Sequence, residues 1–486
     1  MKKFNYLFLK NMAVIAIISA LFLIFSGCDT YNDDYDDEKI IYSDVGPRSP
    51  VATADDPADA IYVSPDGNDT IADGSRDKPY KSINTALANA NPGAAIVLRS
   101  GTYKERRDVR VRISNITIKS AKGEWAVIDL TEFDPGNEEH SGVEFYAEDD
   151  ITRGIVKDCK LQSVEVKGGF YAVNFETKWD WEQPDRSGAS NIIIEDCILH
   201  DSRNDVIKIK PGCDDITIRY NEIYNSGREH AHQSNFTSGE RNAEGIDNVN
   251  GDRMHVHNNY IHDICSNAIY AKGGAIDALI ENNRVERTYG AGILAGFDTS
   301  PDYFDTKVNP KYYENIQGII RNNLIIDTGW EGIGLYASKD AQVYNNTVVN
   351  AVTYGTGNYH SPIYFGVATQ DEENPEGCPP NINPEIHHNI VSQSSAYKNR
   401  IIDIRYTKDP YTIFGLDGNP KMHDNCYYID GRKATFTDNR PPKVENMGLA
   451  AWKTHIEGDN GTIEVNPSLN ADFFATNPQC AGMGIK

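Results

Sequence analysis

The chain has 486 residues, with 47 lysines and arginines against 71 aspartates and glutamates, and a formal net charge of −24. This acidic balance excludes a nucleic-acid-binding protein, because phosphate recognition needs clustered basic residues. Hydrophobic residues make up 39% of the chain and aromatic residues 10%, which excludes both a polytopic membrane protein and a wholly disordered chain. The length allows about three ordinary domains or one elongated repeat domain.

The first 28 residues have the pattern of a signal peptide. Basic residues precede an apolar run over 13–25, which ends in Ser26, Gly27 and Cys28. Small residues followed directly by cysteine resemble a bacterial lipobox, and this resemblance implies that Cys28 becomes the lipidated N-terminus. An ordinary secretory signal with an incidental cysteine is the alternative.

Residues 29–60 are rich in aspartate, and we expect a disordered, solvated linker. The stretch resembles the acidic segment that follows the lipidated cysteine of surface lipoproteins in Bacteroidetes. By that resemblance the protein is an outer-membrane lipoprotein exposed at the cell surface. The sequence has no Cys-x-x-Cys pair, so we do not expect a cysteine zinc site.

An internal repeat runs through the middle of the chain. Segments such as ITIRYNEI, ALIENNRV, GIIRNNLI and QVYNNTVV recur at spacings of 23 to 25 residues, with longer spacings where insertions occur. Aligned on these segments, one polar column is predicted to contain Asp158, Asp196, Asn221, Asn259, Asn283, Asn323, Asn346, Asn389 and Asn425. The same alignment places Cys159 and Cys197 in one register as small buried side chains.

A second motif alternates apolar and polar residues and predicts short strands. It places one isoleucine of each repeat on the same face: Ile207, Ile246, Ile269, Ile293, Ile333 and Ile363. A period near 24 residues with several short strands is typical of one coil of a parallel β-helix, in which stacked coils lie about 4.8 Å apart. Equivalent asparagines can then hydrogen-bond along the stack. We therefore predict an all-β fold, a single-stranded right-handed parallel β-helix over residues 61–430.

The two ends of the β-helix need covers. Residues 81–87 form an amphipathic pattern and predict an N-terminal capping helix. After residue 430 the periodicity fades, and we expect residues 431–486, with Trp452, Phe473 and Phe474, to form an irregular C-terminal cover.

Two segments carry a resemblance to a known superfamily. IYVSPDGNDT with KPYKSINTALANANPGAAIVLRSGTYKE, near residues 61–105, and NAIYAKGGAIDALIENN, from residue 267, resemble pectate-lyase-like right-handed β-helix proteins. The nearest resemblance is to polysaccharide lyase family nine, and it covers roughly residues 60 to 480. It implies a surface-anchored polysaccharide lyase that cleaves an acidic, pectin-like glycan by β-elimination. We expect a monomer with an acidic polysaccharide as partner.

The same fold also carries other functions. A glycoside hydrolase and a non-catalytic glycan-binding protein therefore stay open as alternatives. A hydrolase needs two carboxylates about 5 to 9 Å apart, and Asp247 with Glu244 or Glu331 is the obvious pair. The three functions differ in their products, because only a lyase makes an unsaturated uronate.

β-Elimination requires a positive charge at the uronate carboxylate and a base over C5. The repeat alignment stacks acidic residues before successive isoleucines, and Lys208, Asp247 and Tyr270 just after them. We predict that Asp205, Glu244 and Asp247 hold Ca²⁺, which prefers several hard oxygens.

By its resemblance to the KGG segment, Lys272 is predicted to be the catalytic base. The alternative is that Lys208 and Asp247 form a surface ion pair of little value and that Lys272 is simply solvated. The family-nine lyases have an Asp-Asp-Gly-x-Asp cluster followed by a GFK-type lysine. Here the nearest matches are Glu244-Gly245-Ile246-Asp247 and Ala271-Lys272, so the chain departs from the family pattern at both the metal cluster and the lysine.

Insertions at 227–242, 297–314, 352–361 and 367–383 interrupt the repeat and are predicted to border the binding cleft. In the first insertion, Arg228 is a candidate catalytic cation, and His230 and His232 are candidate contacts for a uronate carboxylate. Sugar rings stack on aromatic side chains, and the predicted aromatic contacts are Tyr270, Tyr289, Trp330, Tyr336 and Tyr364.

Overall fold

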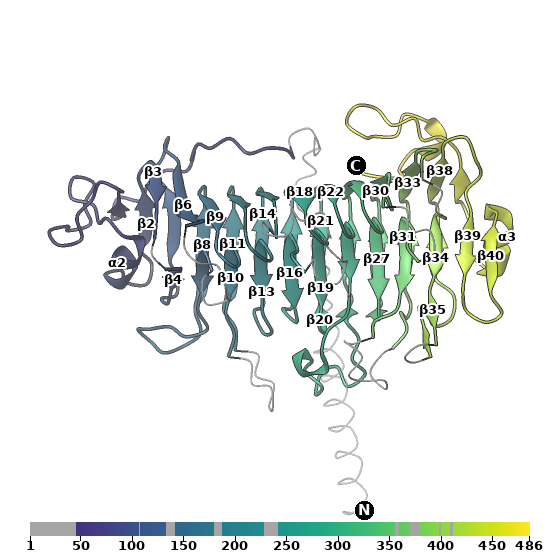
Figure 1. The fold of residues 1–486 in the computed structure, drawn as a ribbon, viewed down its shortest axis with the longest axis horizontal. Coiled ribbons are helices and arrows are strands. Elements are labelled where there is room, and N and C mark those ends of the chain that lie inside the picture. Colours follow the sequence, from purple (N-terminus) through teal and green to yellow (C-terminus); the bar gives the residue numbers. More distant parts are fainter. Residues whose placement is uncertain are drawn as a thin grey trace, which may run out of the picture. The chain divides into compact units, whose positions relative to one another are not determined.

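The computed structural model describes residues 45–105, 107–132, 141–178, 187–227, 242–354, 359–369, 379–397, 400–408 and 412–486. Within these residues, three twelve-stranded sheets run side by side, and each successive coil of the chain adds one strand to each sheet (Figure 1). All neighbouring strands of the three sheets are parallel except the last pair of one sheet. The predicted parallel β-helix is confirmed.

Sheet A contains β1 (Ile61–Val63), β2 (Ala95–Leu98), β5 (Thr117–Ser120), β8 (Lys157–Gln162), β11 (Ser190–Glu195), β14 (Ile216–Arg219), β17 (His255–His257), β21 (Leu279–Glu281), β25 (Ile319–Arg321), β29 (Gln342–Tyr344), β32 (Glu385–His387) and β37 (Lys421–His423). Sheet B contains β3 (Gly101–Tyr103), β6 (Ala126–Leu130), β9 (Glu165–Gly168), β12 (Ile198–His200), β15 (Glu222–Tyr224), β18 (Tyr260–Ile264), β22 (Arg284–Thr288), β26 (Leu324–Thr328), β30 (Thr347–Val349), β33 (Ile390–Gln393), β38 (Cys426–Ile429) and β41 (Ile463–Glu464). Sheet C contains β4 (Val109–Val111), β7 (Val143–Phe145), β10 (Val173–Phe175), β13 (Ile207–Ile209), β16 (Ile246–Val249), β19 (Ile269–Lys272), β23 (Ile293–Ala295), β27 (Ile333–Tyr336), β31 (Ile363–Gly366), β34 (Ile402–Ile404), β39 (Phe436–Asp438) and β40 (Val444–Met447).

Smaller elements lie in the connections. β20 (Ala275–Ile276), β24 (Asn315–Ile316) and β28 (Ser338–Lys339) form a short parallel sheet, and β35 (Tyr406–Thr407) and β36 (Ile413–Phe414) form an antiparallel pair. The helical elements are α2 (Ile83–Ala88), α3 (Leu449–His455), η3 (Pro301–Tyr303) and η6 (Pro478–Cys480).

The predicted N-terminal capping helix is α2. Its N-cap Ser82 accepts a hydrogen bond from the Thr85 amide, which satisfies one of the free amides of the first turn. Ile83, Ala86 and Leu87 are buried, and the helix packs against β1, β2 and β4. These are the first strands of sheets A and C, so the helix covers the open end of the stack.

The isoleucine column forms the core beneath sheet C, as predicted. Ile207 pairs with Ile246, and the same register continues through Ile269, Ile293 and Ile333 to Ile363 and Ile402. None of these side chains is more than 1% exposed. Because side chains alternate along a strand, the residue after each of these isoleucines points outward.

The asparagine ladder occupies the turn between sheets A and B. In the middle coils, each Asn side chain donates to the next Asn side-chain oxygen at 3.0 Å and to a backbone carbonyl of the preceding coil, as Asn259 does to Asn283 and to Ile218. Each side-chain oxygen also accepts the backbone amide of the previous ladder residue. The ladder is confirmed from Asn221 to Asn425.

The predicted ladder is wrong at its first two positions. Asp158 is the second residue of β8 in sheet A and lies beside Asn191 of the next coil, where the two side chains are hydrogen-bonded. Asp196 comes one residue too early, because the Cys197 amide is the group that donates to Asn221. The shared register of Cys159 and Cys197 is wrong for the same reason, although both are buried. The motifs look alike in sequence, but they belong to different corners of the coil.

Strands continue beyond residue 430, with β39, β40 and β41. At this end Trp452 of α3 is fully buried and stacks on Phe436, with ring centroids 5.2 Å apart. Within the described residues, no helix is long and apolar enough to cross a membrane.

The positions of the long connections distinguish one sheet from the other two. The turn from sheet A to sheet B is two residues long in most coils, as between β14 and β15. The insertions at 227–242 and 352–361 lie between sheets B and C, whereas those at 297–314 and 367–383 lie between sheets C and A. The outer face of sheet C is therefore bordered by insertions along both of its edges.

Candidate functional site

The outer face of sheet C carries a column of residues whose chemistry changes from coil to coil. The register of the strands aligns Arg110, Glu144, Asn174, Lys208, Asp247, Tyr270, Leu294, Gly334, Tyr364, Asp403 and Thr437. The predicted stacking of Lys208, Asp247 and Tyr270 is confirmed. The column includes the buried acidic residues Glu144, Asp247 and Asp403, and insertions border this sheet, so its outer face is the candidate site.

Three acidic side chains converge at the middle of this face. Asp205, Glu244 and Asp247 each place a carboxylate oxygen within 4.8 Å of the other two, and none is more than 2% exposed. The amide of Glu244 donates to Asp205 at 2.9 Å. The structure thus brings together the three residues that the sequence suggested as metal ligands.

A lysine ammonium already lies among these acids. Lys208 Nζ donates to Asp247 and lies 3.5 Å from Asp205. The alternative of a weak surface ion pair is wrong, because the Lys208 and Asp247 side chains are only 18% and 3% exposed. Buried in this way, the pair is shielded from solvent screening, and removal of either partner would leave an uncompensated charge.

The acid cluster shifts the pKa values of its members. Burial raises the pKa of Asp205 well above its ordinary value; Lys208 opposes this shift, and Asp247 and Glu244 add to it. Burial likewise raises the pKa of Glu244, although its hydrogen bond with Asp205 acts in the other direction. Burial opposes the charge of Lys208, but Asp247 and Asp205 hold its pKa well above the usual lysine range. These shifts favour the charged form of Lys208 and the protonated forms of Asp205 and Glu244.

These residues fit an ammonium better than calcium. The donor type is right for Ca²⁺, and within the described part of the chain Glu244 Oε2 and Asp247 Oδ1 are buried without a hydrogen-bond partner. However, Ca²⁺ takes six to eight oxygens, and the Lys208 ammonium stands where a second cation would be repelled. As the cluster is built, the donor set does not fit a calcium ion.

Lys272, the predicted base, ends β19 one coil beyond Asp247. Its side chain is half-buried, its Nζ donates to the Asp298 carbonyl at 2.8 Å, and it lies 4.7 Å from the centre of the Tyr270 ring. Lys272 is therefore a positioned group and not a freely solvated one. Nearby Glu314 is fully buried, and burial raises its pKa well above the usual value.

Three of the predicted sugar-stacking tyrosines are covered. Tyr270, Tyr336 and Tyr364 are 1%, 6% and 4% exposed and pack together with Leu294. Tyr336 donates to Glu331 at 2.5 Å. In this structure these rings contact each other and present no open face, so their contact with a sugar stays a prediction.

The other two aromatic candidates are more accessible. Trp330 is half-buried and stacks on His360, with ring centroids 5.0 Å apart and 11° between the planes. Tyr289 is half-buried, and its ring centroid lies 4.4 Å from that of Tyr354. Both follow strands of sheet B and stand at the edge of sheet C.

His360 was missed by the sequence reasoning. Its Nδ1 lies 2.6 Å from Glu331, a carboxylate with no exposed surface. Burial opposes its charge, but the Glu331 carboxylate raises the pKa of His360 above its ordinary value. The available signal was its position in HSPIYFG, just before the isoleucine motif and inside a predicted insertion.

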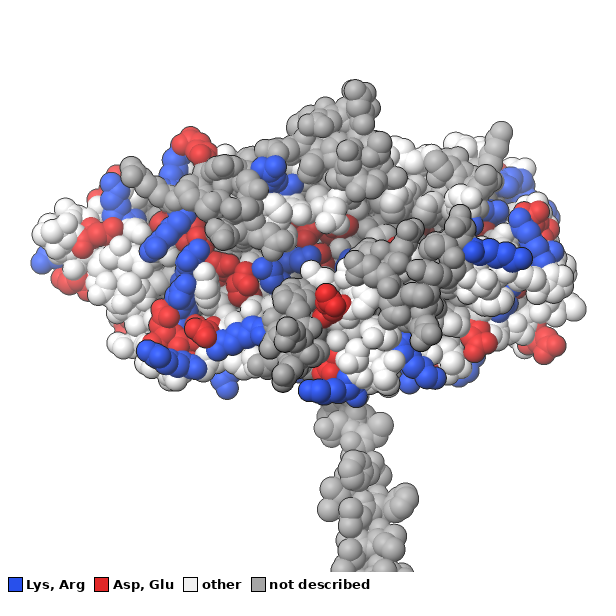
Figure 2. Space-filling model, turned by 60° about the horizontal axis from the view of Figure 1, so that its bottom comes forward, with Lys and Arg blue, Asp and Glu red and all other residues white. Residues whose placement is uncertain are grey.

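Arg228, His230 and His232 lie outside the described residues, as does Cys28. Their predicted roles stay predictions. On the face that Figure 2 presents, basic and acidic side chains are interspersed and no single sign covers the surface. The net charge of −24 therefore does not describe every part of the protein.

Comparison with known proteins identifies the fold family. The family described as "Right handed beta helix region" matches residues 108–364, more than half of the chain, and the chain belongs to this family. Residues 65–120 match a family described as a protein of unknown function, DUF1565. The right-handed β-helix predicted from the sequence is thereby confirmed.

The relatives are distant. The chain is 38% identical to pectate lyase PEL9 of Emericella nidulans over 81 residues, which are 16% of this chain and 19% of that protein. The chain thus matches less than a fifth of this curated relative's length. Among solved structures, pectate lyase Pel9A is 16% identical over 74% of this chain and 82% of its own, with a TM-score of 0.45. A lacto-N-biosidase from Eubacterium ramulus is 11% identical over 84% of this chain and 68% of its own, with a TM-score of 0.48.

Proposed function

We propose that this protein is a polysaccharide lyase that cleaves a uronic-acid-containing, pectin-like glycan by β-elimination on the outer face of sheet C. The observation that carries the proposal is the meeting of Lys208, Lys272 and three buried acids on neighbouring coils of that face. The short match to a pectate lyase supports the same reaction class.

In the proposed reaction, Lys272 is the base. A neutral lysine amine keeps two N–H groups, so Nζ can still donate to the Asp298 carbonyl while its lone pair accepts the C5 proton. The electron pair of the C5–H bond forms the C4=C5 double bond, and the C4–O bond breaks with its electrons on the leaving oxygen. The leaving oxygen must then be protonated, by water or by a group of the protein.

We assign the positive charge near the uronate carboxylate to Lys208. Its ammonium is held by Asp247 and Asp205, and 18% of its side chain is exposed. In this proposal calcium takes no part in the reaction. Arg228 remains a proposed second cation. Lipid anchoring at Cys28, location at the outer-membrane surface, a monomeric state and an acidic polysaccharide partner are further proposals from the sequence.

The test follows ultraviolet absorbance of unsaturated uronate products when the full chain is mixed with a panel of polyuronates, with and without chelator. We expect a rise that chelator leaves unchanged. Lys272→Met should reduce the rate by about 10²- to 10⁴-fold, the usual contribution of a general base. The matched control is Lys160→Met, a half-buried lysine paired with Glu195 on sheet A, which should keep full activity.

Absence of any absorbance change on every polyuronate would refute the proposal. A rise that chelator abolishes would instead restore the calcium prediction and contradict the assignment of Lys208. A rise that survives in Lys272→Met would show that another group is the base.

A glycoside hydrolase is the second candidate, and the Asp205–Glu244–Asp247 cluster is the observation that favours it. Two of these acids have raised pKa values, as a general acid requires. The oxygens lie within 4.8 Å, near the roughly 5 Å typical of retaining enzymes. New reducing ends without ultraviolet absorbance, lost in Glu244→Gln, would identify a hydrolase. Retardation on glycan affinity gels with neither product would identify a non-catalytic binder.

A further inference from the structure

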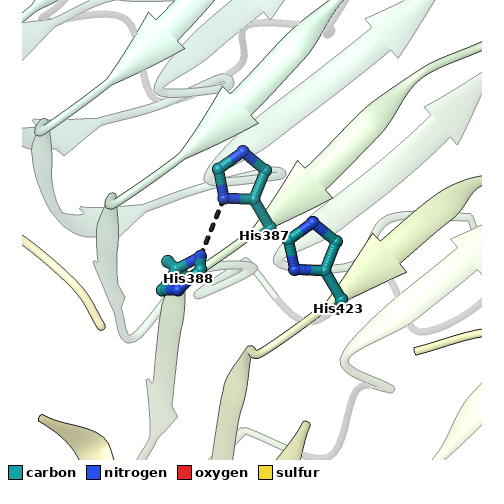
Figure 3. A group of neighbouring side chains, drawn as sticks. All are labelled: His387, His388 and His423. Atoms are coloured by element: carbon teal, nitrogen blue, oxygen red, sulfur yellow. Dashed lines mark hydrogen bonds between the residues drawn. The ribbon is translucent and has the colours of Figure 1, made fainter. Parts of the chain in front are cut away.

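Three histidines meet at the corner between sheets A and B, far along the coil stack from the acid cluster. His387 ends β32, His388 is the turn residue that follows it, and His423 ends β37 in the next coil (Figure 3). One ring nitrogen from each lies within 4.8 Å of the other two. All three side chains are half-buried, so they remain reachable from solvent.

Two of the rings are aligned by the fold itself. His387 and His423 occupy the same register position of sheet A, and their rings stack 4.7 Å apart at 3°. Parallel stacking turns corresponding edges of the two rings in the same direction. Figure 3 shows His388 lying beside this pair, and its Nδ1 is 2.8 Å from Nδ1 of His387.

The third histidine departs from the pattern of its turn. In four other coils this left-handed position is held by an asparagine (Asn258, Asn282, Asn322 or Asn345), with φ between 52° and 57°, and in others by Asp196, Tyr220 or Asp424. Asparagine tolerates this conformation well, and the turn therefore does not require histidine. His388 adopts the same conformation with φ 55°. Because the backbone is fixed there, the His388 ring is held beside the other two.

The surrounding charges are mixed but mainly acidic. Asp424 lies 2.9 Å from His423 Nδ1, and Glu385 lies 3.8 Å from His423 Nε2. Lys486 is close enough to act on His388. A carboxylate that orients a ligating histidine is a usual partner in such sites, and Asp424 stands in that place.

We propose that His387, His388 and His423 form a binding site for a divalent transition metal, with Zn²⁺ as the reference ion. Imidazole is the ligand type that suits zinc, copper and nickel. Zinc takes nitrogens at about 2.0–2.1 Å in tetrahedral geometry, so two ligating nitrogens lie about 3.3 Å apart. Side-chain movements of up to about 1.5 Å would close the site from the present spacing of at most 4.8 Å. A water molecule supplies a fourth ligand. This site is independent of the proposed lyase function.

A bound metal would also stabilise the contacts of the C-terminal segment with the β-helix. The amide of Gly484 donates to the His388 carbonyl at 2.7 Å, and Asn345 donates to the carbonyls of Gly482 and Gly484. The site therefore joins two consecutive coils at the point where the C-terminal segment returns to the β-helix. We expect metal binding to stabilise the last coils by mass action.

The experiment titrates the full, untagged chain with zinc chloride after chelator treatment and follows heat release. Cobalt(II) titration gives a second readout, because tetrahedral nitrogen coordination produces visible absorption bands. We expect saturable binding, and His388→Asn should weaken it at least tenfold. This substitution is chosen because asparagine already occupies the same turn position in other coils, so the fold is retained.

The matched control is His257→Gln. His257 stands in the same register column of sheet A, four coils earlier, and stacks on His255 at 4.2 Å. The His257→Gln variant should bind zinc as tightly as the unchanged chain does. Equal zinc affinity in His388→Asn, His423→Gln and the unchanged chain would overturn the proposal, as would the absence of both heat and cobalt absorption.

Discussion

The asparagine ladder and the outer face of sheet C are built on the same repeating backbone but follow opposite rules. In the ladder, the same residue recurs from Asn221 to Asn425, and each side chain satisfies buried backbone groups of the adjacent coils. On the outer face of sheet C the residue changes at every coil, and among the residues that the structure describes Glu244 Oε2 and Asp247 Oδ1 are buried without a hydrogen-bond partner.

The difference separates folding from function. A repeated, fully hydrogen-bonded column lowers the free energy of the fold, because no buried polar group is left without a partner. A column that varies and leaves buried charge incompletely satisfied costs stability, and such costs are typical of functional sites. The His387–His388–His423 corner is a smaller case, since a histidine there occupies a turn position that asparagine holds in four other coils.

The largest effect is expected where the repeat is most regular. Asn283→Leu removes the acceptor of the Asn259 amide and the donor to the Val256 carbonyl. Leaving two buried backbone groups unpaired should lower the free energy of unfolding by about 4 kcal/mol, measured by chemical denaturation. Asn419→Ala, at an exposed asparagine, is the control and should change little. A loss of less than about 1 kcal/mol in Asn283→Leu would contradict the structural role of the ladder.

The second prediction concerns pH at the strand column that borders the ladder. Burial, together with the charge of His255, lowers the pKa of His257 from 6.5 to about 4. The folded state therefore favours the neutral ring, so its stability is fully present above pH 6.5 and is lost as pH falls toward 4. This difference corresponds to about 3 kcal/mol. Urea unfolding at several pH values should show that the free energy of unfolding of His257→Gln falls less between pH 6.5 and pH 4 than that of the unchanged chain. The same pH dependence in both proteins would contradict the assignment to His257.

The third prediction changes the internal cation of the sheet C site. Lys208→Met leaves Asp247 and Asp205 without their positive partner. We expect about 2 kcal/mol of destabilisation near neutral pH, less than for a typical broken buried pair because the acids can take up protons instead. The loss of stability should be smaller at acidic pH, where the carboxylates are protonated.

The same variant sharpens the question of metal binding. With the ammonium removed, added calcium should raise the melting temperature of Lys208→Met but not that of the unchanged chain. Equal calcium stabilisation of both proteins would show that Lys208 does not exclude the ion.

The smallest effect is expected at the edge of the site. Trp330→Ala should weaken binding of an oligouronate by about fivefold, roughly 1 kcal/mol, because a partly accessible indole face is lost. The control is Tyr220→Ala, an aromatic residue that is 41% exposed at the sheet A–B turn. Isothermal titration calorimetry of both variants compares their affinities for the oligouronate. An equal loss of affinity in Tyr220→Ala would show that Trp330 makes no specific contact with the sugar.

Much of the fold could be predicted from the sequence, because stacking repeats the same local rule in every coil. The isoleucine column beneath sheet C, the later asparagines of the ladder and the capping helix α2 all follow from periodicity and turn chemistry. Asp158 and Asp196 were misplaced because similar motifs occur near the start of one strand of sheet A and in the turn that follows another. Local sequence does not say which corner of the coil a motif occupies.

The candidate site was predictable only in part. Asp205, Glu244 and Asp247 converge because alternation and register bring equivalent positions together. Burial was not visible in the sequence: it converts an expected surface ion pair into a buried one and covers Tyr270 and its neighbours. His360 was missed because its partner Glu331 lies 29 residues away.

The sequence by itself determined the coil, its period and the direction of each side chain, because these depend on local alternation and on contacts between equivalent positions. Only the tertiary structure decided which charges are shielded from water, which cation stands among the acids, and that three histidines from two coils meet at one corner. Those properties depend on desolvation and on distances between residues of different coils and connections, and neither quantity is encoded in a single repeat.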